Sequence, residues 1–103
     1  MSSRLIEIIT LERFKEITDN KQIIVSSHAI DHLSDLQRKL YKLHDLIFIL
    51  EKEIPKLIAL QKNGRYTAYY GRKWGYLKLI ISIQESKVII ITFVNVDTLP
   101  RLK

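Results

Sequence analysis

The stretch 65–96 constrains the fold of this chain more than any other part. It contains three runs rich in β-branched and aromatic residues, separated by the breaks 71–75 and 84–87. Such runs favour strands, and breaks that contain Gly or Ser are typical of turns. The stretch therefore predicts a sheet.

A fourth strand precedes this stretch, so we expect strands over 56–61, 65–70, 76–84 and 87–96. Asn63-Gly64 is a strong hairpin signal, and the other two connections are also short. Strands joined by such short turns must be antiparallel. The second half of the chain is thus predicted to be an antiparallel sheet of about four strands.

Alternation within 76–84 predicts the two faces of that sheet. Leu77, Leu79, Ile81 and Ile83 fall on one face, with polar residues mainly on the other. We expect the apolar face to pack on helices and the second face to meet solvent or a ligand. The run 88–93 is apolar on both faces and is expected to be the central strand.

The first half of the chain is predicted to be mainly helical. Thr10 suits the N-cap of a short helix over 11–18, a second helix is expected over 28–40, and a well-buried third helix should close before Pro55. The run 5–9 fits a short strand or a lead-in turn, and the run 21–25 fits a short strand or an extended link. The predicted fold class is α+β, with N-terminal helices on one face of a C-terminal antiparallel sheet, in a single domain spanning 1–103.

Composition narrows the environment and the partners. The chain has 103 residues, no cysteine, and a formal net charge of +6. A cysteine-free sequence with no long apolar run and no signal-peptide pattern predicts a cytoplasmic protein with no membrane partner. The positive charge favours polyanionic partners, nucleic acid first.

Several segments together resemble a known group of proteins. Their residues are KQIIVSSHAIDHL, DLIFILEKEIP, GRYTAYYG, YLKLIISI and VIIITFVNVDTLP, which cover most of 10–100. This pattern resembles a small uncharacterised family with a His-Ala-x-x-Arg helix, which looks related to the RelE, ParE and BrnT toxins. His28 matches the family histidine, whereas His32 stands where that family has Arg.

The resemblance implies a fold, an activity and a partner. It implies RelE-like helices packed on an antiparallel sheet, metal-independent endoribonuclease activity in active members, and an acidic antitoxin-like protein as partner. Carried over to this chain, it makes His28, Arg65, Tyr70 and Lys78 the candidate catalytic residues, with Tyr69 an alternative to Tyr70. Phosphate would be held by Arg65, Arg72 and Lys78, and protons handled by His28 or Tyr70.

A basic, aromatic stretch also predicts nucleic-acid contact from the residues alone. There is no Asp or Glu between Ile54 and Gln84, and aromatic side chains there could stack on bases while cations hold phosphates. Alternation puts Tyr66 and Tyr70 on one face and Tyr69 on the other, so at least one pair should belong to the core. The candidate binding residues are Lys62, Arg65, Tyr69, Arg72, Lys73, Trp74 and Lys78.

Other kinds of site are not indicated. His28 and His32 are four residues apart, but no HExxH motif surrounds them and no third ligand is marked, so we expect neither a metal nor a cofactor. The function predicted first is RNA binding, RNA being preferred to DNA, with toxin-type cleavage as an extension. The alternative is a non-catalytic module that binds protein or DNA through the basic sheet and dimerises through it.

Overall fold

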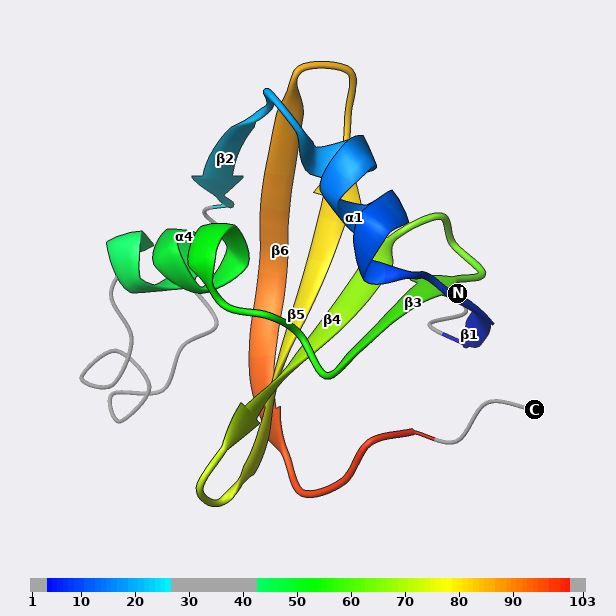
Figure 1. Cartoon of the computed structure of the whole chain (residues 1–103), viewed down its shortest axis with the longest axis vertical. Helices are drawn as coiled ribbons and strands as arrows, with labels where there is room; N and C mark the ends of the chain where they lie inside the picture. Colours follow the sequence, from blue (N-terminus) through cyan, green and yellow to red (C-terminus); the bar gives the residue numbers. More distant parts are fainter. Residues whose placement is uncertain (1–3, 27–42, 101–103) are drawn as a thin grey trace.

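A computed structural model describes residues 4–26 and 43–100 of the chain, and in this part a six-stranded sheet carries two short helices (Figure 1). The strands lie in the order β1-β3-β4-β5-β6-β2. The elements are β1 (Leu5–Ile8), α1 (Leu11–Thr18), β2 (Gln22–Val25), α4 (Leu43–Lys52), β3 (Leu57–Gln61), β4 (Tyr66–Arg72), β5 (Gly75–Ile83) and β6 (Lys87–Val96).

The predicted fold class is wrong, because the sheet is larger and is mixed. β1 joins it antiparallel to β3, and β2 joins it parallel to β6. Each added strand has four residues, too few for an alternating pattern to separate a strand from an extended link. The second helix expected over 28–40 lies outside the described residues, so the described part is dominated by sheet.

The antiparallel meander of the second half is confirmed. β3, β4, β5 and β6 are consecutive neighbours, each antiparallel to the next. The Asn63-Gly64 turn has Gly64 at a φ of 88°, and the Gln61 amide donates to the Arg65 carbonyl over 2.7 Å. β6 is an interior strand between β5 and β2, but it is not the central strand, because β4 and β5 lie in the middle of the sheet.

The two helices lie on the same face of the sheet, which we call the helix face (Figure 1). Thr10 caps α1 as predicted, since its hydroxyl accepts from the Arg13 amide over 3.2 Å. α4 ends before Pro55 as expected, but it is buried on one side only, because Leu46 and Ile49 are buried whereas Phe48 is 58% exposed. Buried on the helix face are Phe14, Leu46, Ile49, Ala68, Tyr70, Leu77, Leu79, Ile81, Val88, Ile90 and Phe93.

The opposite face, which we call the far face, follows from the strand register. Leu57, Tyr69, Lys78 and Val94 are successive cross-strand partners and therefore share this face. Gly71 and Tyr76 form the neighbouring pair, at the end of the sheet where β4 turns into β5. The far face thus places Tyr69 and Lys78 between the aliphatic Leu57 and Val94, so its side chains are more mixed than those of the helix face.

Candidate nucleic-acid interface

Tyr70, a candidate catalytic residue, lies in the core. Its side chain is 1% exposed on the helix face, and its hydroxyl has no hydrogen-bond partner in the described part of the chain. Burial raises the pKa of this phenol, and the negative charge of Glu53 raises it further. Tyr70 is therefore a neutral core side chain that an external substrate does not reach.

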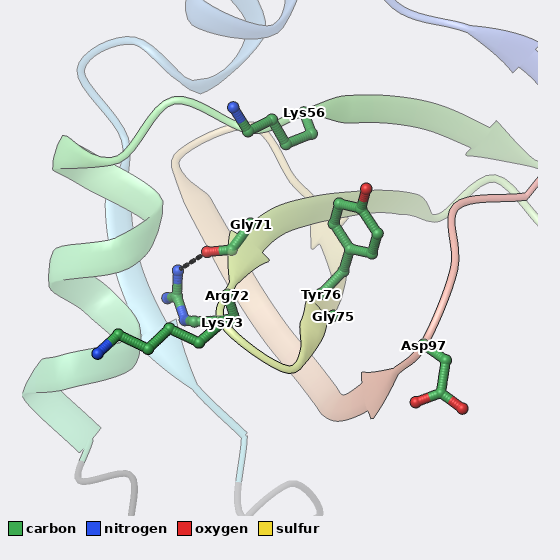
Figure 2. A pocket seen from close by; sticks show the side chains of 7 residues that line it. All are labelled: Lys56, Gly71, Arg72, Lys73, Gly75, Tyr76 and Asp97. Carbon is green, nitrogen blue, oxygen red and sulfur yellow. Dashed lines mark hydrogen bonds between the residues drawn. The ribbon is translucent and has the colours of Figure 1, made fainter.

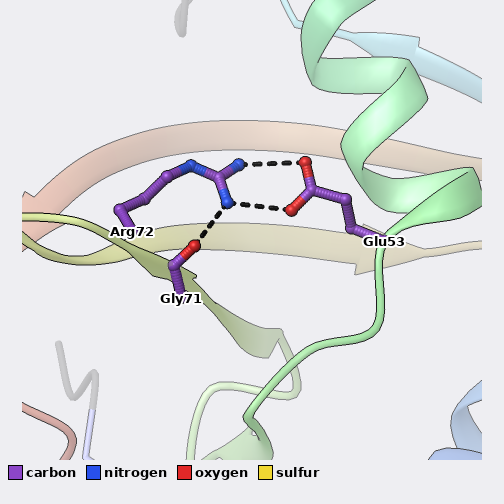
Figure 3. Close-up of polar contacts among 3 residues, drawn as sticks. All are labelled: Glu53, Gly71 and Arg72. Atoms are coloured by element: carbon purple, nitrogen blue, oxygen red, sulfur yellow. Dashed lines mark hydrogen bonds and ion pairs between the residues drawn. The ribbon is translucent and has the colours of Figure 1, made fainter.

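Arg72 is held in an ion pair (Figure 3). Its guanidinium donates to both carboxylate oxygens of Glu53, over 2.8 and 3.1 Å, and to the Gly71 carbonyl over 2.7 Å. Glu53 directly follows α4, so the pair joins the end of that helix to the end of β4. Because Glu53 neutralises the charge, Arg72 acts as a structural tie in this structure.

The β3–β4 turn places Lys62 and Arg65 at the other end of the sheet. Both are exposed, and all of β4 separates Arg65 from the end of that strand. At roughly 3.3 Å per residue, the seven-residue strand spans more than about 20 Å. These two cations therefore do not share a binding patch with Arg72 and Lys73.

Tyr69 and Lys78 form a cross-strand pair on the far face. The Lys78 ammonium nitrogen lies 5.9 Å from the centroid of the Tyr69 ring, and Tyr69 is only 3% exposed. Burial raises the pKa of this phenol also. Lys78 and Tyr70 thus occupy opposite faces, and His28 lies outside the described residues, so the structure does not bring the candidate catalytic residues together.

An open hollow lies on the far face at the β4–β5 turn (Figure 2). Lys56 and Lys73 on its border are exposed, and Tyr76 is half-buried. The stem of Lys56 covers Gly71, since a Cβ added to Gly71 would lie 3.1 Å from Lys56 Cε. The lining residues are Lys56, Gly71, Arg72, Lys73, Gly75, Tyr76 and Asp97.

The turn beside the hollow is held tightly in place. Lys73 and Trp74 form a two-residue loop, and Trp74 is 49% exposed at its tip. Gly75 has a φ of 139°, and a Cβ there would lie 2.5 Å from the Val96 carbonyl oxygen. The backbone at the end of β6 thus supports the turn, which presents an indole ring to the outside.

Five side chains make up what we call the basic corner: Lys56, Lys73, Trp74, Tyr76 and Lys78. Lys78 belongs to it because it follows Tyr76 by two residues on the same face of β5. Among the residues that line the hollow, Asp97 is the acidic one, so positive charge prevails. Three lysines next to aromatic rings can hold phosphates while the rings offer stacking surfaces.

The sequence-based selection of site residues contained only part of the basic corner. Lys73, Trp74 and Lys78 were selected, whereas Lys56 and Tyr76 belong to the same basic, aromatic run but were not among the selected site residues. The acid-free run between Ile54 and Gln84 includes both, and it was the signal that could have found them. What the run could not reveal is that Lys56, near the start of β3, folds over Gly71 in β4.

Comparisons with protein-family models, with curated proteins and with solved structures each find no match to this chain. Within residues 4–26 and 43–100, no helix has the length and hydropathy needed to cross a membrane. In the same part of the chain, His, Asp and Glu side chains do not gather in a group of three that could hold a metal ion. The candidate site therefore rests on the geometry of the chain itself.

Proposed function

We propose that this chain is a small RNA-binding module that contacts the phosphate backbone through the basic corner. The observation that carries the proposal is that Lys56 and Lys73 border one hollow, while Lys78 lies two residues beyond Tyr76 on the far face and Trp74 is exposed at the adjoining turn. Phosphate contacts supply most of the affinity of non-specific nucleic-acid binding. The net charge of +6 adds long-range attraction for a polyanion.

The proposal includes binding but not cleavage. Cleavage of RNA needs a proton-transferring group and a cation within reach of the same phosphate. Tyr70 is buried on the helix face, Lys78 lies on the far face, and Arg65 lies beyond the other end of β4. Endoribonuclease activity, an acidic antitoxin partner and membership of the RelE-like group stay predictions from the resemblance.

RNA is placed before DNA because of that resemblance. A lysine ammonium group binds phosphate, which RNA and DNA both carry, so the lysines do not distinguish the two polymers. The RNA assignment is thus the more specific part of the proposal, and competition between RNA and DNA strands of equal length tests it separately.

The first experiment measures binding and cleavage together. A labelled single-stranded RNA is titrated with the protein in EDTA at low and moderate salt, and mobility and fragment length are both followed. Lys73→Ala is compared with Lys62→Ala, which removes the same charge from an exposed turn at the other end of the sheet. We expect Lys73→Ala to weaken binding several-fold, Lys62→Ala to bind like the wild type, and the RNA to stay intact.

Two results would change this view. If both variants lost affinity equally, binding would be a diffuse effect of net charge and the basic corner would not be its site. Cleavage in EDTA that Arg65→Ala abolished would establish the endoribonuclease, with a site at the β3–β4 turn.

A second candidate function is self-association through β1. Among the described strands β1 lies at the edge of the sheet, and its Ile6 and Ile8 are each 56% exposed. An exposed apolar edge strand is a template for pairing with another strand, and a second copy of β1 is the simplest occupant. Sedimentation of the wild type and of Ile8→Lys tests this, because a dimer formed through β1 would dissociate in the variant.

A further inference from the structure

Among the described residues, a flexible side chain closes the space above Gly71. Of the described atoms outside its immediate neighbours in the chain, a Cβ on Gly71 would meet only Lys56, with Cε at 3.1 Å and Cγ at 3.8 Å. A lysine stem rotates easily, and its ammonium group readily follows an anion. An outward rotation of Lys56 would leave bare strand backbone exposed at this point.

An aromatic ring stands beside this space. Tyr76 is the cross-strand partner of Gly71, and the close-up shows Lys56 and Tyr76 flanking it (Figure 2). Tyr76 is half-buried, so part of its ring remains accessible, in contrast to the ring of Tyr69 under Lys78. A planar group that slides over Gly71 would lie against this ring.

We propose that the hollow seats one unpaired base of a single strand, stacked on Tyr76 above Gly71, while Lys56 turns outward to an adjoining phosphate. This inference rests on the proposed function and specifies the ligand as single-stranded. In a duplex the bases are stacked on one another, so a duplex offers the hollow only its backbone. Gly71 is then a specificity-determining position, because any side chain there would fill the space that the base occupies.

The proposal separates two groups of residues by the ligand they affect. Lys56 and Lys73 contribute to the binding of single-stranded RNA and of duplex RNA, because both kinds of RNA carry phosphates. Tyr76 and Gly71 contribute only to the binding of the single strand, because only an unpaired base enters the hollow. Base stacking on an aromatic side chain is worth enough to change affinity roughly tenfold.

The test uses fluorescence anisotropy with three RNA probes of equal length: a single strand, a duplex and a single strand with abasic sites. We expect Tyr76→Leu to weaken binding of the intact single strand roughly tenfold and to leave duplex binding unchanged. Tyr76→Phe keeps the ring and should bind like the wild type. Gly71→Ala should weaken single-strand binding several-fold, and thermal unfolding checks that each variant is folded.

The abasic strand is the sharpest probe, because it keeps the phosphates and lacks bases. The wild type should bind it as weakly as Tyr76→Leu binds the intact strand. Binding of a base in the hollow would be refuted if the abasic strand bound as tightly as the intact one, or if Tyr76→Leu weakened the binding of duplex and single strand equally. Binding through the phosphate backbone would then remain. If the wild type bound none of the probes, the proposed function itself would fail.

Discussion

At the scale of single residues, the burial of Tyr70 keeps one candidate proton-transferring group away from the surface of the sheet. Its hydroxyl is buried without a partner among the described residues. A buried polar group left unsatisfied costs about 1–3 kcal/mol, and replacing it by an apolar group of the same shape recovers part of that cost. We therefore expect Tyr70→Phe to unfold at an equal or higher urea concentration than the wild type. A loss of more than about 1 kcal/mol would mean that the hydroxyl makes a hydrogen bond in solution.

The same residue should make the protein sensitive to alkali. Its pKa is raised above the ordinary 10.0, so the folded state holds the phenolic proton more tightly than the unfolded state does. The unfolded chain loses this proton first, so stability is present below pH 10.0 and is lost as the pH rises past it. Urea unfolding at increasing pH should show a steeper loss for the wild type than for Tyr70→Phe. The variant retains part of the slope, because the pKa of Tyr69 is raised in the same direction.

Features that depend on neighbouring residues could be predicted from the sequence, whereas contacts between distant residues could not. The Thr10 cap and the Asn63-Gly64 turn depend on neighbours within a few positions, and both are present. The partner of Arg72 lies 19 residues away, directly after α4, and nothing in the local pattern marks Glu53 as that partner. A cation selected as a phosphate ligand therefore proved to be half of an ion pair.

At the scale of elements, the pair of Arg72 and Glu53 ties the end of α4 to the sheet. Both side chains are partly exposed, so solvent screens the pair and we expect Glu53→Gln to cost about 1 kcal/mol of stability. Binding of RNA should not fall, since removing an acid leaves more positive charge near the hollow. Glu51→Gln, on the exposed side of the same helix, is the matched control. An equal loss of stability in both variants would show that general charge, and not this pair, is responsible.

The β4–β5 turn depends on Gly75 for two reasons. Its φ of 139° is one that residues with a side chain rarely adopt, and a Cβ would lie 2.5 Å from the Val96 carbonyl oxygen. We expect Gly75→Ala to cost more than about 2 kcal/mol in urea unfolding. Gly64→Ala isolates the conformational part, because Gly64 also has a positive φ but has no atom within 4 Å of an added Cβ. If the two variants lost equal stability, the contact with β6 would carry no weight.

Strands of the meander were predictable, and the outer strands were not. The run 87–96 matches β6 at both ends because its β-branched residues and bounding turns agree. β1 and β2 have four residues each, and β2 reaches its parallel partner β6 across most of the chain. Parallel pairing of segments so distant leaves no local pattern, so the fold class was misjudged although the single strands were considered.

At the scale of the whole molecule, the proposal of RNA binding depends on where the positive charge lies on the surface. The net charge of +6 was visible in the composition, but its distribution over the two ends of the sheet was not. One end carries Lys62 and Arg65 on an open turn, and the other carries the basic corner with its rings and hollow. If the basic corner is the site, these two ends should differ in their contribution to binding.

The salt dependence of RNA binding tests this central claim most directly. Affinity for a single-stranded RNA is measured over a range of salt for the wild type, for Lys56→Ala/Lys73→Ala and for Lys62→Ala/Arg65→Ala. Each lost phosphate contact should reduce the steepness of log affinity against log salt by about 0.7. The slope of Lys56→Ala/Lys73→Ala should therefore fall by about 1.4, and that of Lys62→Ala/Arg65→Ala should hardly change. Equal slope changes in the two double variants, or no salt-dependent binding by the wild type, would contradict a phosphate-binding site at the basic corner.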